Sequence, residues 1–328
     1  MRSELAIALL LIGCSTNAPP MSEAPVDNEE RSPPADEAPP SPTTPPAPTA
    51  TTPETPPAKP SHKASLGVCW TDKTCNRAMI VGHGGDWTPT GAPYGSMAAL
   101  VAAYEHDVDS VKIDVRVTKD NVPVVAHSSP FEAWESLDCY GRKVEDMTAA
   151  DFEKCHFSSK SSEAYQRLDT MLAYAKGKMT VQLCVKDAKD YARTIAQVLT
   201  SNAEDFVYLE VSTADLTEKL PSLAGSSQVY YLINIEGDLD QVDVLSSLKN
   251  PKVFMIEMNA GPNVADVIKN KIHPAGWKAF LYEKSQTASP STFKAHFDQG
   301  FDVVSANATD NNKKARIEVN KSRNVSPP

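Results

Sequence analysis

The sequence predicts an α/β protein built as a (β/α)8 TIM barrel that follows a disordered tether. Apolar strand-like runs alternate with helical stretches from about residue 66 to about residue 318, and such alternation is typical of a parallel sheet. The region holds roughly 250 residues, the usual size of one such barrel. Titratable side chains follow apolar strands, as at His83 and His127, and the C-terminal mouth of a barrel presents its functional groups in this way.

The first 14 residues have the features of a lipoprotein signal peptide. Arg2 supplies a positive charge, and Leu5–Ile12 forms an apolar core that is too short to span a bilayer. Cys14 follows Leu-Ile-Gly in the pattern of a bacterial lipobox. We therefore expect an exported lipoprotein, lipidated at Cys14 and anchored to the outer membrane or cell surface. The alternative is an ordinary secretory signal with an unrelated cysteine.

Residues 15–64 are predicted to be a disordered linker, residues 65–320 the barrel and residues 321–328 a disordered tail. The linker contains 15 of the 26 prolines and almost no large apolar residue, so it cannot bury enough surface to offset the entropy of ordering. We place His62 in this linker. The chain carries a net charge of −10, which makes a nucleic-acid partner unfavourable.

Nine strands are predicted for the eight places in the barrel. The surplus strand is either Val253–Asn259 or the short third strand, Val122–His127. Helices are predicted between most strands, among them Ser96–Glu105 and Leu168–Ala175. The nine runs are Ile80–His83, Ser110–Arg116, Val122–His127, Thr180–Lys186, Phe206–Ser212, Val229–Ile235, Val253–Asn259, Lys278–Lys284 and Asp302–Ser305.

Beyond the lipobox the chain has five cysteines, which export would allow to form disulfides. Cys69 and Cys75 are neighbours before the first strand, and Cys139 and Cys155 flank a loop and a helix. We predict these two local pairs, although four cysteines allow three pairings. Cys184 is predicted to be free and buried.

Four motifs in the first half of the barrel region occur in a recognisable order. They are His83-Gly84-Gly85, Ala92-Pro93-Tyr94-Gly95-Ser96, the run KIDVRVTKD at 112–120 and Val124-Val125-Ala126-His127. This order resembles the glycerophosphodiester phosphodiesterase family, of the PLC-like phosphodiesterase barrel superfamily. The resemblance implies a barrel of that type and a divalent metal such as calcium or magnesium. It also implies that His83 and His127 act as acid and base on a glycerophosphodiester or phospholipid headgroup.

The chain departs from the family pattern where the metal would bind. Family glutamates are replaced by Tyr94, Lys112 and Cys184, and Asp114 remains of the expected acids. The family's arginine after the first histidine is replaced by Gly84. A metal site of the family's type is therefore degenerate in this sequence.

Two functional hypotheses stay open. In the first, the protein is a phosphoric diester hydrolase in which Lys112 supplies the positive charge of the cation and Lys186 helps to hold the phosphate. Related bacterial phosphatidylinositol-specific phospholipases C are metal-free in this way. Asp114 and Asp86 would be supporting residues, and Asp86 is close enough in sequence to His83 to orient its imidazole or, equally, to form part of the turn. In the second, the barrel is a catalytically inactive pseudoenzyme whose mouth binds a lipid, glycan or protein.

Four glutamates near the ends of the later strands are a feature of this chain. By strand alternation, we expect several of them to point into the mouth. They could neutralise Lys112 and Lys186, form a relocated metal site or act as the paired acids of a glycoside hydrolase. The four are Glu210, Glu236, Glu257 and Glu283.

Overall fold

A computed structural model describes residues 61–325, which belong to one compact unit. The predicted signal peptide, the lipidation site Cys14 and nearly all of the predicted linker lie outside these residues. No helix within residues 61–325 has the length and apolar character needed to cross a membrane.

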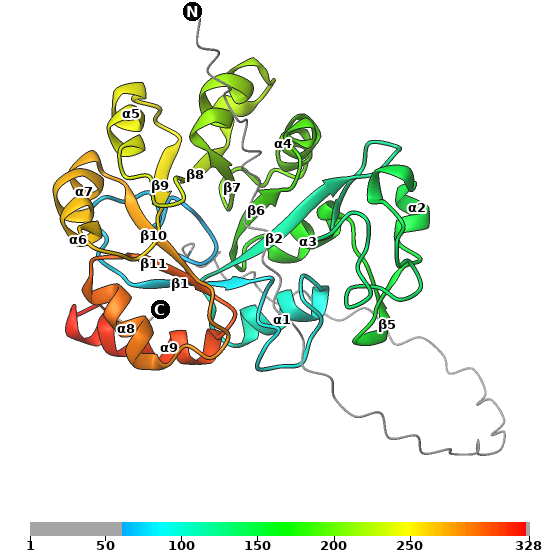
Figure 1. The fold of residues 1–328 in the computed structure, drawn as a ribbon, viewed down its shortest axis with the longest axis horizontal. Helices are drawn as coiled ribbons and strands as arrows, with labels where there is room; N and C mark the ends of the chain where they lie inside the picture. Colours follow the sequence, from blue (N-terminus) through cyan, green and yellow to red (C-terminus); the bar gives the residue numbers. More distant parts are fainter. Residues whose placement is uncertain (1–60, 326–328) are drawn as a thin grey trace, which may run out of the picture. The chain divides into compact units, whose positions relative to one another are not determined.

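Eight parallel strands close into a barrel, as the sequence predicted (Figure 1). Closure is complete because β1 pairs with both β2 and β11. His83 on β1 is opposite Lys112 on β2, and Lys112 is opposite Gln182 on β6. The barrel strands are β1 (Met79–His83), β2 (Ser110–Val117), β6 (Thr180–Val185), β7 (Val207–Ser212), β8 (Tyr230–Asn234), β9 (Val253–Glu257), β10 (Lys278–Glu283) and β11 (Val303–Ala306).

The short strand β3 (Pro123–Val125) lies outside the closed barrel because it runs antiparallel to β2. The alternative that the third strand is peripheral is therefore confirmed. The alternative that Val253–Asn259 is surplus is wrong, since this segment contains β9, which pairs with β8 and β10. A short apolar strand has the same sequence pattern whether its neighbour is parallel or antiparallel.

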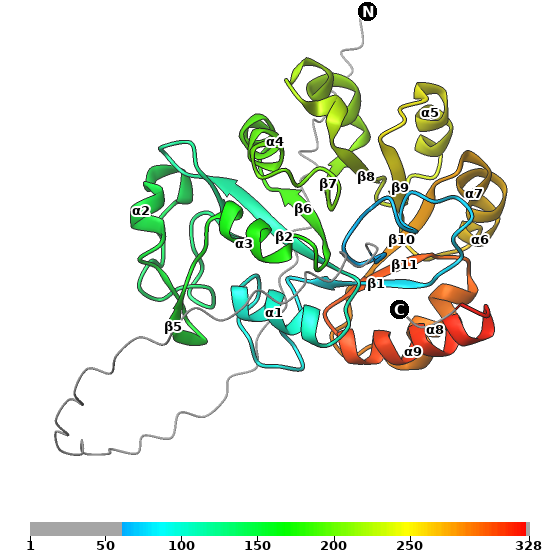
Figure 2. The same cartoon turned by 180° about the vertical axis from the view of Figure 1, so that it is seen from behind.

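Helices surround the barrel and bury the apolar outer face of its strands (Figures 1 and 2). Ser96 caps the first helix by accepting a hydrogen bond from the N–H of Ala99, which explains why the predicted start was nearly correct. The last helix continues to Ser322, past the predicted end of the barrel at residue 320. The helices are α1 (Met97–Glu105), α2 (Ala149–Phe152), α3 (Leu168–Ala175), α4 (Tyr191–Thr200), α5 (Gln241–Leu248), α6 (Val264–Val267), α7 (His273–Ala275), α8 (Pro290–Asp298) and α9 (Thr309–Ser322).

The segment before β1 contributes to the apolar cluster that fills the barrel. Trp70 is fully buried in this cluster and packs on Tyr208 of β7, with ring centroids 5.8 Å apart. His62, assigned to the linker from the sequence, is also buried, and its Nε2 lies 2.7 Å from Asp109 Oδ1. The sequence did not reveal this contact, because the residues around His62 have the composition of the linker and Asp109 is distant in the sequence.

Both predicted disulfides are present. Cys69–Cys75 secures the segment that carries Trp70, and Cys139–Cys155 ties the loop after β3 to the chain that follows α2. Cys184 is buried, as predicted, but the described residues contain no free cysteine, so the prediction of a free thiol is wrong. Spacing along the chain identifies local pairs and gives no sign of other partners.

The chain between β3 and α3 forms a smaller apolar cluster. Its strands β4 (His156–Phe157) and β5 (Lys160–Ala164) form an antiparallel pair that the sequence did not suggest. Phe131 packs against Tyr165, and the Tyr165 hydroxyl donates to the carbonyl of Glu135 at 3.0 Å. The cluster therefore supports the loop that follows His127.

Candidate active site

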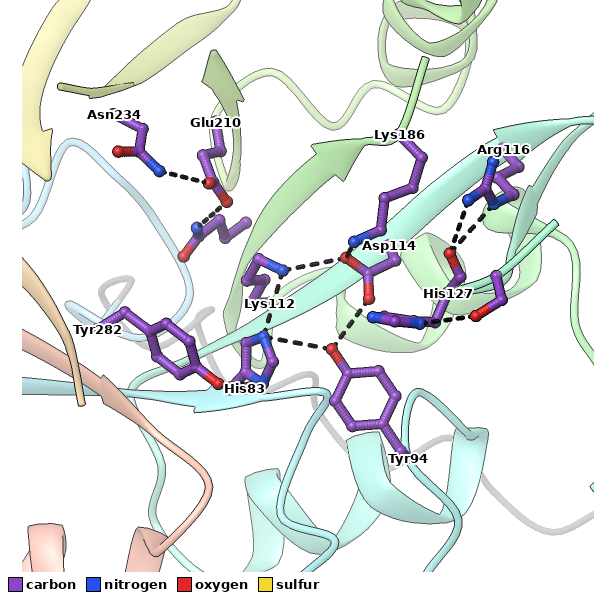
Figure 3. Close-up of polar contacts among 12 residues, drawn as sticks. His83, Tyr94, Lys112, Asp114, Arg116, His127, Lys186, Glu210, Asn234 and Tyr282 are labelled. Carbon is purple, nitrogen blue, oxygen red and sulfur yellow. Dashed lines mark hydrogen bonds and ion pairs between the residues drawn. The ribbon is translucent and has the colours of Figure 1, made fainter. Parts of the chain in front are cut away.

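Strands β1, β2 and β6 bring four polar side chains together, and the loop before α1 adds a fifth (Figure 3). His83 is the last residue of β1, and Lys186 directly follows β6. Lys112 and Asp114 are two residues apart on β2, so both point to the same side of the strand. Tyr94 joins them from the loop before α1. The structure thus gathers four of the predicted site residues at one place.

Asp114 is the centre of this site because three donors converge on its carboxylate. Lys112 Nζ and Lys186 Nζ each lie 3.0 Å from Oδ1, and the Tyr94 hydroxyl donates to Oδ2 at 2.9 Å. Burial alone would raise the pKa of Asp114, but the two ammonium groups hold it well below its usual value. Two ammonium groups against one carboxylate leave this cluster with one surplus positive charge.

The charges of the two lysines are not equally stabilised. Burial opposes the charge of Lys112, but Asp114 and Glu210 raise its pKa above the usual value. Burial lowers the pKa of Lys186, and Asp114 offsets only part of this effect. The buried Lys186 Nζ makes no hydrogen bond within the described residues beyond its ion pair with Asp114. Its N–H groups are therefore available to an anion.

His83 is held in one orientation by two residues from late strands. Asn307 Oδ1 lies 3.0 Å from Nδ1, which assigns the proton to Nδ1 and leaves the lone pair on Nε2. Nε2 lies 3.4 Å from both Lys112 Nζ and the Tyr94 hydroxyl. Tyr282 stacks on the imidazole with centroids 4.4 Å apart. Burial and the charge of Lys112 hold the pKa of His83 well below its usual value, so the imidazole is neutral at pH 7.

The hairpin formed by β2 and β3 delivers His127 to the site. Its carbonyl oxygen accepts hydrogen bonds from Arg116 Nε and Nη2 at 3.1 and 2.9 Å. Its Nδ1 lies 3.0 Å from Ser128 Oγ and 3.9 Å from Glu135 Oε1. Burial, reinforced by the charges of Lys186 and other nearby cations, lowers the pKa of His127 to about 4. This imidazole is also neutral at pH 7.

Tyr94 contacts the rings of both histidines. Its ring centroid lies 5.3 Å from that of His83 and 5.7 Å from that of His127. Trp87 and Trp134 pack edge-on against Tyr94, at 5.7 and 6.3 Å. A ligand that bridges the two imidazoles must therefore contact or displace the Tyr94 ring.

Asp86 does not orient His83, which was one of the two roles considered for it. Its carboxylate binds His106 Nδ1 at 2.7 Å and the hydroxyl of Thr309. Asn307 takes the orienting role expected of Asp86 and was not predicted. Its position directly after the last barrel strand is the only signal for it in the sequence, because 224 residues separate it from His83.

Two of the four late-strand glutamates point into the barrel. Glu210 is 2% exposed and accepts hydrogen bonds from Gln182 Nε2 at 2.9 Å and Asn234 Nδ2 at 3.2 Å. Glu257 places a buried carboxylate oxygen, Oε2, near it. Neither glutamate forms an ion pair with a lysine among the described residues, so any neutralisation of the lysines acts over a longer distance.

The other two glutamates lie elsewhere. Glu236 is exposed. Glu283 points away from the barrel interior, and its Oε2 lies 2.8 Å from His296 Nε2. The prediction failed for Glu283 because its neighbour Tyr282, which stacks on His83, occupies the inward-facing position of β10.

The donor set does not fit the divalent metal that the family resemblance implies. A hard cation requires several oxygen ligands, whereas the carboxylate of Asp114 already binds two ammonium groups and a hydroxyl. The late-strand glutamates form no close ligand group within residues 61–325. Within the same residues, the side chains whose ligand atoms lie close enough together to hold a metal ion are Asp138, Cys139 and Cys155. Both of these cysteines are in a disulfide.

Residues 82–207 match the model of the Glycerophosphoryl diester phosphodiesterase family. The match runs from the end of β1 to the start of β7 and includes both candidate catalytic histidines. This part of the barrel is therefore similar to that family. The resemblance inferred from the sequence motifs is therefore confirmed for the glycerophosphodiester phosphodiesterase barrel. No curated protein sequence matches the chain.

Solved glycerophosphodiester phosphodiesterases share this fold. One from Parabacteroides distasonis has a TM-score of 0.61 and 20% identity, covering 76% of this chain and 88% of its own. Another, from Agrobacterium tumefaciens, has a TM-score of 0.57 and 17% identity, covering 72% and 98%. A phosphodiesterase from Oleispira antarctica, solved with the product sn-glycerol-3-phosphate, has a TM-score of 0.55 and 16% identity, covering 73% and 96%.

Proposed function

We propose that this barrel hydrolyses a phosphodiester of a lipid headgroup or a glycerophosphodiester and that Lys112 and Lys186 take the place of a divalent cation. The observation that carries the proposal is the convergence of both ammonium groups on Asp114, beside Nε2 of His83. The sn-glycerol-3-phosphate bound to the related Oleispira phosphodiesterase supports a glycerol phosphodiester as the substrate.

The lysine pair suits a phosphodiester because it is positive, buried and only partly satisfied. Asp114 cancels one of the two charges, and Lys186 retains unused N–H donors. Fixed donors in a site with little water stabilise the negative charge that develops on the phosphoryl oxygens during the attack. The carboxylate of Asp114 holds both ammonium groups in position.

The two histidines share the proton transfers in this mechanism. His83 is neutral with its lone pair on Nε2, so it accepts the proton of the attacking hydroxyl or water. His127 carries a proton to the oxygen that leaves. A bound phosphodiester brings a negative charge that raises the pKa of His127 from about 4 toward neutrality and so favours the protonated form.

A second candidate function is binding without cleavage. Tyr94 contacts both imidazoles, and its hydroxyl is held by Asp114. With the ring in this position, a phosphate reaches the lysines while the tyrosine keeps it from bridging His83 and His127. The barrel would then be a pseudoenzyme that binds a lipid headgroup or a related ligand.

Turnover and binding assays on the full-length chain distinguish these functions. The substrates are sn-glycero-3-phosphoethanolamine, sn-glycero-3-phosphoglycerol and phosphatidylinositol, each with and without chelator. We expect hydrolysis that falls at least about 100-fold in His127→Ala. The control is His296→Ala, which alters a histidine outside the barrel mouth. Binding without turnover in the native protein supports the pseudoenzyme, and the absence of both contradicts both functions.

We also propose that Cys14 carries a lipid anchor that holds the exported protein at the outer membrane or cell surface. The lipobox and the proline-rich linker support this. Cell fractionation tests it: the native protein should sediment with membranes, and Cys14→Ala should release it. A native protein that stays in the soluble fraction would contradict the anchor.

A further inference from the structure

Three buried side-chain oxygens inside the barrel lack a hydrogen-bond partner among the described residues. They are Gln182 Oε1 on β6, Glu257 Oε2 on β9 and Ser305 Oγ on β11. Gln182 is 0% exposed and Ser305 is 1% exposed. An unpaired buried polar group costs about 1–3 kcal/mol, so native proteins usually supply such groups with water or a ligand. We therefore expect a polar partner, such as water or a ligand, beside these three oxygens in the barrel mouth.

Two of these oxygens belong to a continuous acidic row on β6 to β9, formed by Gln182, Glu210, Asn234 and Glu257. Amides of Gln182 and Asn234 both donate to Glu210, and Asn234 is opposite Glu257 in the pairing of β8 with β9. Figure 3 shows Glu210 and Asn234 beside Lys112 in the mouth. The row thus offers one hydrogen-bonded carboxylate and two unpaired acceptors.

The acidic row adjoins the lysine pair. Gln182 is opposite Lys112 in the pairing of β2 with β6, and Lys186 directly follows β6. The row therefore begins on the strand that leads to one phosphate-binding lysine and pairs with the strand of the other. Glu210 raises the pKa of Lys112. Burial and the charge of Glu210 raise the pKa of Glu257 well above its usual value. A cation between the two carboxyl groups would relieve this repulsion.

We propose that the acidic row is a headgroup subsite that binds the protonated amine of a phosphodiester substrate. The inference rests on the function proposed above and names the substrate class as a zwitterionic diester of the ethanolamine type. A primary ammonium group provides three N–H donors and one positive charge. These match the free oxygens of Gln182 and Glu257 and the carboxylate of Glu210. The phosphate and amine subsites lie on neighbouring strands, as one short headgroup requires.

Isothermal titration of the full-length chain with two diesters tests the subsite. The ligands are sn-glycero-3-phosphoethanolamine and sn-glycero-3-phosphoglycerol, which share the phosphodiester and differ in headgroup charge. We expect about tenfold tighter binding of the ethanolamine diester. Glu257→Gln should abolish this preference. The matched control is Glu283→Gln on β10, which should retain the preference because its carboxylate faces His296 outside the mouth.

A second titration with ethanolamine alone separates the subsite from the phosphodiester function. If the native protein binds ethanolamine at millimolar concentration and Glu257→Gln does not, the subsite is supported. If the native protein also binds neither diester, only the proposed phosphodiester function fails. Equal affinity for the two diesters in the native protein overturns the subsite and leaves phosphodiester binding intact. A preference that survives Glu257→Gln also overturns it.

Discussion

At the residue scale, two departures from the family pattern form one packing unit. Gly84 has φ +74°, and a Cβ at this position would lie 2.1 Å from Tyr94 Cε2. The Tyr94 ring can pack over this backbone only because residue 84 has no side chain. The sequence showed both substitutions, at the positions of the family's arginine and glutamate, but gave no sign that they touch.

Replacing Gly84 by alanine should therefore destabilise the barrel through Tyr94. We expect Gly84→Ala to cost about 2–4 kcal/mol of unfolding free energy from overpacking and backbone strain. In a Tyr94→Ala background, the same change should cost only the strain. Urea unfolding of the four proteins measures the coupling, and additive costs would contradict the packing unit. Gly141→Ala is the control for strain alone, since Gly141 has φ +75° and open space around it.

The lowered pKa of His127 predicts how stability depends on pH. Its pKa is about 4 in the folded protein and about 6.5 when unfolded. The folded state thus binds fewer protons between these values, and the free energy of unfolding falls as pH falls through this range. Between pH 7 and pH 4.5, His127 alone should account for about 2 kcal/mol.

Urea unfolding of the native protein and of His127→Asn at these two pH values tests this expectation. On acidification from pH 7 to pH 4.5, the free energy of unfolding should fall by about 2 kcal/mol less in the variant than in the native protein. Identical losses in the two proteins would show that the imidazole remains solvated and titrates normally. His83 acts in the same direction and remains in both proteins.

At the scale of elements, local sequence signals located the helices and strands. Contacts between residues distant in the sequence determined which side chains these elements bring to the site. Ser96 and the apolar run after it marked α1. The antiparallel direction of β3 had no local signal, yet it brings Ala126 to Asp114, where the Ala126 N–H donates to the Asp114 carbonyl at 3.1 Å. His127 reached the predicted site by this hairpin and not by the parallel strand that was expected.

The segment before β1 should contribute substantially to stability because it fills the barrel from within. Trp70→Ala leaves a large cavity beside Tyr208 and should cost about 3–5 kcal/mol. Tyr140→Ala is the surface control, since Tyr140 is 66% exposed, and should cost less than about 0.5 kcal/mol. Chemical denaturation measures both. A small cost for Trp70→Ala would mean that this segment packs only loosely on the barrel.

At the scale of the whole molecule, closure of the barrel joins residues that the sequence keeps far apart. The alternating pattern predicted eight parallel strands, and the first-half motifs predicted His83, Lys112, Asp114 and His127 at one mouth. The pattern did not predict Asn307, because its role depends on β11 closing against β1. For the same reason, motif order identified the family better than it identified the contacts of each side chain.

The central claim is that the lysine pair replaces a divalent cation. Its most direct test is the initial rate of sn-glycero-3-phosphoethanolamine hydrolysis by the full-length chain in excess EDTA and in added calcium or magnesium. We predict that the native rate changes less than about twofold between these conditions and that Lys112→Met lowers kcat at least about 100-fold in each. Circular dichroism verifies that the variant is folded. Turnover that EDTA abolishes and calcium or magnesium restores would contradict the account.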